Sequence, residues 1–150
     1  METMTQPKFN PIDILVVEDN IGDARLIKEV LNEHKIFNSL FIVNDGVEAM
    51  NFLLKKGKYN DSPKPDLIIL DLNLPKKDGR EVLAEIKGNN DLKSIPVVIM
   101  TISQAETDIL KSYNLHANCY ITKPIDLDQF IKVVKSIEEF WFSIVKLPTK

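Results

Sequence analysis

The sequence predicts an α/β protein built on a parallel sheet of five strands with helices on both faces. Short apolar stretches rich in branched residues alternate strictly with longer amphipathic segments along the 150 residues. The apolar stretches are nearly continuous and lack the alternation of a strand with one wet face, which indicates strands buried on both sides. This order of elements is typical of a doubly wound sheet whose crossover connections are right-handed.

The individual elements can be assigned from hydrophobic spacing. The predicted strands cover residues 12–17, 39–43, 66–70, 95–100 and 119–122. Five predicted helices carry apolar residues three and four positions apart, at residues 21–34, 46–55, 80–87, 104–115 and 127–145. Residues 56–65, rich in Gly, Asp, Ser and Pro, are predicted to form an exposed loop. Five strands connected in this way favour the flavodoxin-like strand order 2-1-3-4-5.

The composition limits the class of protein. Its 44% hydrophobic residues, 27% charged residues and mean hydropathy of −0.09 are ordinary for a globular domain. A net charge of −3 gives no basic footprint for nucleic acid, and one cysteine with two histidines offers little for a disulfide or zinc site. No apolar run approaches the roughly 20 residues of a membrane span, and no signal peptide is visible. We expect a cytoplasmic protein with an N-terminal extension (1–11), one domain (12–145), a C-terminal tail (146–150) and no output domain.

Polar residues stand at the carboxyl ends of four predicted strands. Glu18 and Asp19 follow the first strand, Asp71 follows the third, Thr101 closes the fourth and Lys123 follows the fifth. Because these strand ends share one edge of a parallel sheet, we expect the five side chains to converge in a crevice there. Each has an ordinary alternative: acids after a strand often cap the next helix, and a lone lysine is often a solvated surface residue. Asp71 is the hardest to explain in that way, because an unpaired carboxylate beside a buried strand is costly.

Such a cluster of carboxylates calls for a cation. Carboxylates held close together repel one another unless a hard divalent ion neutralises them, and all-oxygen ligands favour Mg²⁺ over zinc. Mg²⁺ prefers carboxylates combined with a phosphate group, so a phosphoryl group on an aspartate beside the metal fits that preference. Catalysis of phosphoryl transfer is mainly positioning and charge neutralisation.

Four short motifs together resemble the receiver domains of two-component response regulators. They are residues 16–20 (VVEDN), 70–75 with 78–79 (LDLNLP and DG), 100–101 (MT) and 122–124 (TKP). The resemblance spans nearly the whole chain, from about residue 12 to residue 145. The stretches 19–26 and 45–49, the long loop before residue 66 and the ending at residues 140–148 are similar to stand-alone regulators of the phytochrome-associated type.

The resemblance implies a phosphoacceptor and a metal site. Asp71 would take the phosphoryl group from the phosphohistidine of a histidine kinase, which the subgroup suggests is phytochrome-like. Asp19 would bind Mg²⁺ directly, and Glu18 would assist directly or through water. Asn73 would supply its backbone carbonyl to the metal, to which Asp71 would also bind.

The resemblance also implies a conformational switch. Lys123 would pair with the phosphate, and Thr101 would move to hydrogen-bond it after phosphorylation. Tyr120 stands at the family's aromatic switch position, where rotation of the ring is coupled to that movement. The Lys123–Pro124 peptide bond is a candidate for the cis form. Ile102 departs from the pattern, because the family usually has a small residue after the switch threonine, and its bulk would narrow access to the site.

The last predicted helix suggests which surface contacts a signalling partner. One apolar stripe, which can face the sheet, consists of Phe130, Val134, Ile137, Trp141 and Ile144. Three further apolar residues fall largely off that stripe, namely Val133, Phe140 and Phe142. They indicate either a broad buried face or a surface for a homodimer or another protein, formed by the fourth and fifth helices and the fifth strand. No DNA-recognition helix is visible, so we expect the domain to signal by direct contact with an unknown downstream protein. We expect no nucleic acid or membrane partner.

Two other functions compete with a phosphoacceptor switch. A metal-dependent phosphatase acting through an aspartyl intermediate typically needs a second acid two residues after the nucleophile and a cap domain. That position is Asn73, and no insertion is large enough for a cap. A pseudo-receiver acting only as a scaffold is disfavoured by retention of the carboxylates, the threonine and the lysine. A phosphate loop is unsupported, because none of the five glycines forms the required pattern.

Overall fold

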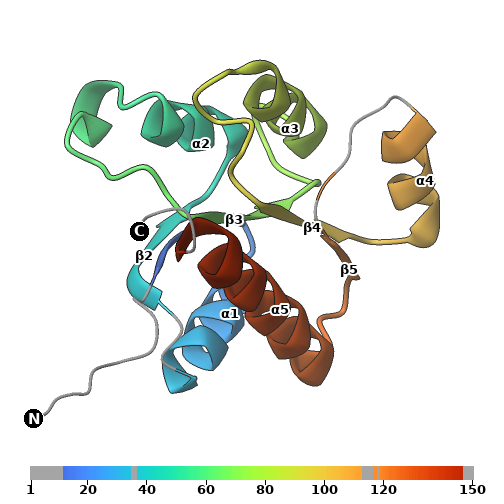
Figure 1. Ribbon diagram of the computed structural model, residues 1–150. Coiled ribbons are helices and arrows are strands. Elements are labelled where there is room, and N and C mark those ends of the chain that lie inside the picture. The colour runs from blue at the N-terminus through green and yellow to red at the C-terminus, as the bar shows by residue number, and fades with distance from the viewer. Residues whose placement is uncertain (1–11, 35–36, 113–116, 118, 147–150) are drawn as a thin grey trace, which may run out of the picture.

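A computed structural model describes residues 12–34, 37–112, 117 and 119–146 (Figure 1), and for residues 37–38, 112 and 137–146 it describes the backbone alone. The strands are β1 Ile12–Val17, β2 Phe37–Val43, β3 Leu67–Asp71, β4 Val97–Thr101 and β5 Cys119–Thr122. The helices are α1 Ile21–Glu33, α2 Gly46–Leu53, α3 Gly79–Gly88, α4 Gln104–Ser112 and α5 Leu127–Lys146, with a 3₁₀ turn, η1, at Gly57–Tyr59. All strand pairings are parallel, in the order β2-β1-β3-β4-β5. The predicted fold class and strand order are confirmed.

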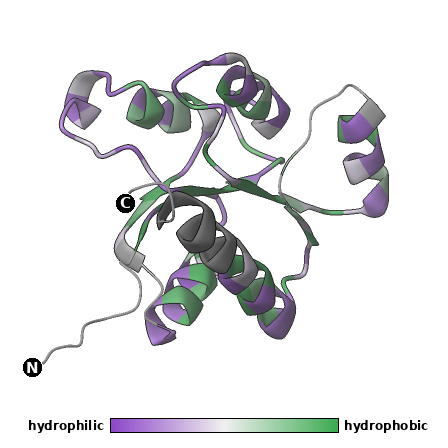
Figure 2. Cartoon of the chain, viewed as in Figure 1, coloured by the Kyte–Doolittle hydropathy of each residue, from purple (hydrophilic) through white to green (hydrophobic). Residues whose placement is uncertain are grey.

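The sheet is covered on both faces, with α2, α3 and α4 on one side and α1 and α5 on the other (Figure 1). Successive residues of each strand enter opposite apolar clusters. In β3, Ile68 and Leu70 pack towards α2 and α3, whereas Leu67 and Ile69 pack towards α1 and α5. All four are fully buried, and each contributes roughly 1.5–3 kcal/mol relative to an exposed side chain. Figure 2 shows the same pattern, with hydrophobic strands between helices that turn polar faces outward.

Some boundaries differ from the predicted ones. Asp71 is the last residue of β3, in register with Met100 of β4, so the acceptor candidate is held by the sheet itself. The second helix ends at Leu53, earlier than predicted, because Lys55 adopts a left-handed φ of 57°. The predicted continuation of the fourth helix over 113–115 lies outside the described residues.

The predicted loop at 56–65 is partly anchored. Its turn η1 brings Tyr59 against the ring of Phe52, and Phe52 in turn packs on Phe41 of the edge strand β2. The Tyr59 hydroxyl donates a hydrogen bond to Glu48 on α2. Burial and this carboxylate raise the pKa of Tyr59 to about 12, so the hydroxyl stays a donor at neutral pH.

The described side chains of α5 include only part of the predicted apolar stripe. Phe130 and Val134 are fully buried on the sheet, and Val133 is half-buried beside them. The other stripe and off-stripe residues, 137, 140–142 and 144, lie outside the part whose side chains are described. In the described part of the chain, no helix is long and apolar enough to cross a membrane.

Candidate functional site

The polar residues that the sequence places at the strand ends come together in one crevice of about 600 Å³ at the carboxyl edge of the sheet. Five of the predicted site residues line it, namely Glu18, Asp19, Asp71, Asn73 and Lys123, whereas Thr101 is not among its lining residues. The remaining lining residues are Asn20, Ile21, Gly22, Asp23 and Ile102. Of these described residues, Lys123 is the one cation, so the crevice is strongly acidic.

Asp71 lies at the base of this crevice and is 2% exposed. Its Oδ1 accepts a hydrogen bond from the backbone N–H of Asn73 at 3.0 Å. Its Oδ2 accepts one from Nζ of Lys123 at 2.9 Å. Both carboxylate oxygens are therefore held in place by partners from outside the strand, which fixes the side chain as a reacting group requires.

The backbone at the start of α3 packs closely against the backbone of Asp71 and Leu72. The N–H of Gly79 donates to the carbonyl of Leu72 at 3.0 Å, which folds the start of α3 back against the end of β3. A Cβ at position 79 would lie 2.5 Å from the carbonyl oxygen of Asp71. The glycine of the Asp-Gly pair that forms part of the sequence resemblance is thus needed, because a side chain at position 79 would collide with the backbone of β3.

Glu18 and Asp19 lie beside Asp71. One carboxylate oxygen from each of the three residues falls within 4.8 Å of the others, a spacing that suits a shared cation. Helix capping does not account for these acids, because the Asn20 side chain caps α1 by accepting from the N–H of Asp23 at 2.9 Å. Glu18 is fully buried and Asp19 is exposed, so the cluster extends from the protein interior to solvent.

The ammonium of Lys123 forms ion pairs with the carboxylates of Glu18 and Asp71. Its Nζ lies 2.9 Å from Oε1 of Glu18 and 2.9 Å from Oδ2 of Asp71. Burial alone would lower the pKa of Lys123, but its contacts with these two carboxylates and their negative charges outweigh burial and hold the pKa above its usual value. The ammonium is therefore charged throughout the neutral range. The Lys123–Pro124 peptide bond is cis.

The two switch candidates lie next to this group. Thr101 is fully buried, and its Oγ1 has no hydrogen-bond partner among the described residues. A buried hydroxyl without a partner is costly, which makes a new acceptor for it favourable. Tyr120 is half-buried, and its hydroxyl accepts a hydrogen bond from the N–H of Ala117 at 3.0 Å. Ile102 is 60% exposed at the mouth of the crevice, where its bulk borders the entrance.

The pKa of Glu18 is strongly raised in the crevice. Burial, above all, together with the neighbouring Asp71 raises its pKa from 4.5 to about 7, although the contact with the Lys123 ammonium opposes the rise. The folded protein thus holds a proton on Glu18 that the unfolded chain releases at lower pH.

We therefore expect the unfolding free energy of the metal-free protein to fall by about 3 kcal/mol as the pH rises from 4.5 to 7. The sign follows because the unfolded state binds fewer protons than the folded state over this range. Urea unfolding in EDTA across these pH values measures the effect. The difference between wild type and Glu18→Gln isolates it, and parallel pH profiles for the two proteins would contradict the assignment to Glu18.

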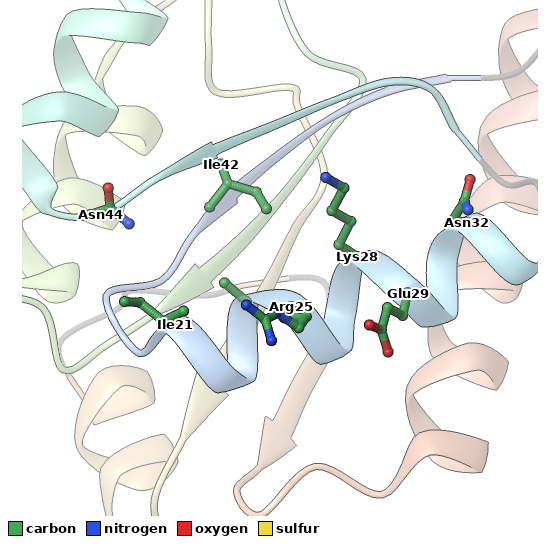
Figure 3. A pocket seen from close by; sticks show the side chains of 8 residues that line it. Ile21, Arg25, Lys28, Glu29, Asn32, Ile42 and Asn44 are labelled. Carbon is green, nitrogen blue, oxygen red and sulfur yellow. The ribbon is translucent and has the colours of Figure 1, made fainter.

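A second hollow, of about 460 Å³, lies between α1 and β2 (Figure 3). Arg25 and Lys28 of α1 and Ile42 of β2 line it. It contains none of the acidic or hydroxyl residues predicted for the site. This hollow therefore offers none of the predicted chemistry.

Sequence reasoning missed one contributor to the crevice. Asp23, in the first turn of α1, places its Oδ2 3.2 Å from Nζ of Lys123. In the sequence, Asp23 belongs to the stretch 19–26 that carries part of the family resemblance. The signal available was its position three residues after the cap Asn20, which keeps it near the strand end, but the distance to β5 depends on how α1 packs.

Comparison with known proteins decides the family. Residues 14–135, most of the chain, match the family described as the response regulator receiver domain. The chain belongs to this family. A receiver domain is a component of two-component signalling rather than a conventional enzyme, which disfavours the phosphatase alternative.

Individual receiver proteins are similar over almost their whole length. Response regulator Rcp1 of Synechocystis sp. is 56% identical over 145 residues, which cover 97% of this chain and 99% of Rcp1. The crystal structure of the Mn²⁺-bound form of Rcp1 has a TM-score of 0.74 with 56% identity, covering 87% of this chain and 94% of Rcp1. The phosphorylated cyanobacterial phytochrome response regulator RcpA has a TM-score of 0.75 with 53% identity, covering 90% of this chain and 96% of RcpA.

Proposed function

We propose that this receiver domain is a phosphorylation switch whose acceptor is Asp71 and whose phosphodonor is a histidine kinase. The observation that carries the proposal is the setting of Asp71, a buried carboxylate fixed between the Asn73 N–H and the Lys123 ammonium in an acidic crevice. Phosphorylated RcpA, which is similar in sequence and fold, supports it. The proposed unit is residues 12–145.

The transfer step follows from this geometry. A carboxylate oxygen of Asp71 attacks the phosphorus of the phosphohistidine, a P–O bond forms, and the P–N bond breaks with its electron pair leaving on the imidazole nitrogen. Lys123, close to Oδ2, offsets the negative charge gathered between the donor and the carboxylates. The N–H of Asn73 keeps the acceptor oriented during the approach.

The donor set of the crevice fits Mg²⁺. Glu18, Asp19 and Asp71 supply only oxygen ligands, and a single ammonium leaves their charge largely uncompensated. These three residues, with the backbone carbonyl of Asn73, would hold the ion. When bound, Mg²⁺ neutralises the carboxylates and the charge on the transferred phosphoryl oxygens. The Mn²⁺-bound form of Rcp1, which is similar in sequence and fold, supports a divalent metal site in this chain.

Phosphorylation then changes the surface through Thr101 and Tyr120. The buried Thr101 hydroxyl, which lacks a partner, gains an acceptor in the phosphoryl group. Its movement leaves space beside β5 into which the half-buried Tyr120 ring rotates. The altered face, formed by α4, β5 and α5, would contact a downstream protein or a second copy of the chain.

The proposed phosphodonor partner is a histidine kinase of the phytochrome type. The near full-length similarity to Rcp1 and the similarity to RcpA, which is described as a phytochrome response regulator, support that choice. The signal would pass by protein contact, as expected for a stand-alone regulator.

A small phosphodonor tests the proposal directly. Incubation with acetyl phosphate and Mg²⁺ is expected to add one phosphoryl mass to the intact protein, and fragmentation is expected to locate it on Asp71. No addition should occur in EDTA. A phosphoryl group located on any other residue would contradict the proposal.

A further inference from the structure

The ammonium of Lys123 contacts three carboxylates, one of which, Asp23, is not among the predicted site residues. Besides Glu18 and Asp71, each at 2.9 Å, it contacts Asp23 of α1 at 3.2 Å. A lysine ammonium has three N–H donors, and one of them makes the hydrogen bond to Oδ2 of Asp71, whereas Oε1 of Glu18 has no hydrogen-bond partner among the described residues. The contacts of the ammonium with Glu18 and Asp23 are ion pairs. A phosphoryl group on Asp71 takes over the N–H that Asp71 accepts, and the ammonium then moves towards it against the attraction of the other two carboxylates.

Asp23 is the partner that is released most easily. Its side chain is 35% exposed, whereas those of Glu18 and Asp71 are 0% and 3% exposed. Water can therefore solvate the Asp23 carboxylate after separation, while a buried carboxylate without its partner would be strongly destabilising. The contact of Asp23 with Lys123 is also the longest of the three.

We propose that Asp23 is a positioning residue for phosphorylation, whose carboxylate holds the Lys123 ammonium in an ion pair in the unphosphorylated protein and releases it to the phosphoryl group on Asp71. This inference rests on the proposed function of Asp71. Asp23 keeps the lysine in the crevice before transfer and opposes its new contact afterwards. The contact also ties the start of α1 to the end of β5, so its release alters the constraint on α1 when the acceptor is loaded.

The inference has a definite sign. Without the Asp23 carboxylate, Lys123 gives an N–H to the phosphoryl group without first breaking an ion pair. We expect Asp23→Asn to lower the half-saturating concentration of trifluoroberyllate, a phosphoryl mimic, by about threefold to fivefold in saturating Mg²⁺, the range that a partly exposed ion pair supports. Mg²⁺ affinity measured without the mimic should stay within about twofold of wild type, because Asp23 is not one of the three clustered carboxylates.

Two measurements separate this role from simpler ones. Glu29→Gln removes an exposed carboxylate from the same helix and is expected to leave both constants unchanged. A double-mutant cycle on urea unfolding with Asp23→Asn and Lys123→Ala should show coupling between the two sites, because the residues are in contact.

Three outcomes would overturn the inference. An absent coupling would mean that there is no contact, and an unchanged or raised half-saturating trifluoroberyllate concentration would mean that the contact is merely structural. A parallel loss of Mg²⁺ affinity in Asp23→Asn would mean that Asp23 acts as a general negative charge. By contrast, wild-type protein that binds no trifluoroberyllate and takes up no phosphoryl group on Asp71 would overturn the proposed function itself, and this inference with it.

Discussion

Asp71→Asn is expected to abolish phosphorylation by acetyl phosphate, with incorporation falling below about 1% of wild type. The asparagine side chain has nearly the same shape and keeps an oxygen that can accept from the N–H of Asn73, so the crevice should stay folded. Its amide, however, lacks the carboxylate nucleophile. Intact-mass measurement after a timed incubation gives the result directly, and incorporation at the wild-type rate would show that the acceptor lies elsewhere.

A matched control comes from the other end of the same strand. Asp66 immediately precedes β3, and its Oδ2 accepts from the N–H of Asp13 at 2.9 Å. Burial, above all, raises the pKa of Asp66. Like Asp71, Asp66 is therefore a carboxylate beside β3 that accepts a backbone hydrogen bond. Asp66→Asn is expected to remain phosphorylated at close to the wild-type rate. A comparable loss in both variants would indicate damage to the strand rather than removal of the acceptor.

The sequence was sufficient to predict which residues meet at the sheet edge, because strand topology alone brings strand ends together. Glu18, Asp71 and Lys123 follow or close separate strands, and parallel pairing in a fixed order leaves them little freedom. The cap of α1 was ambiguous between Asp19 and Asn20. The structure assigns it to Asn20, which leaves Asp19 available to the crevice.

Contacts that depend on helix packing were not predictable in the same way. The approach of Asp23 to Lys123 requires a particular rotation and height of α1 against the sheet. The guanidinium of Arg80 on α3 likewise lies 3.4 Å from Glu106 of α4, and Glu106 also accepts from the N–H of Ile102 at 2.9 Å. Such distances follow from side-chain packing between elements far apart in sequence, which hydrophobic spacing does not encode.

Lys123→Ala is expected to retain Mg²⁺ binding but to lose the conformational response to phosphorylation. The lysine is not among the clustered oxygen ligands, and its removal takes away a positive charge that competes with the metal for Glu18 and Asp71. Mg²⁺ should therefore bind at least as tightly as in wild type. The phosphoryl group, however, would lose the cation that follows β5 and whose backbone N–H donates to the carbonyl of Thr101 at 2.7 Å, and with it the proposed link to Thr101.

Amide hydrogen exchange with and without trifluoroberyllate measures that response. In wild-type protein we expect changes at the β4–α4 connection that follows Thr101, and in Lys123→Ala we expect them to be lost although Mg²⁺ still binds. Lys132→Ala, which removes an exposed lysine from α5, should respond like wild type. Because Lys123 lowers the pKa of Glu18, its loss should also move the stability decline of the metal-free protein above pH 7. A full exchange response in Lys123→Ala would show that the metal and Thr101 suffice for switching without the lysine.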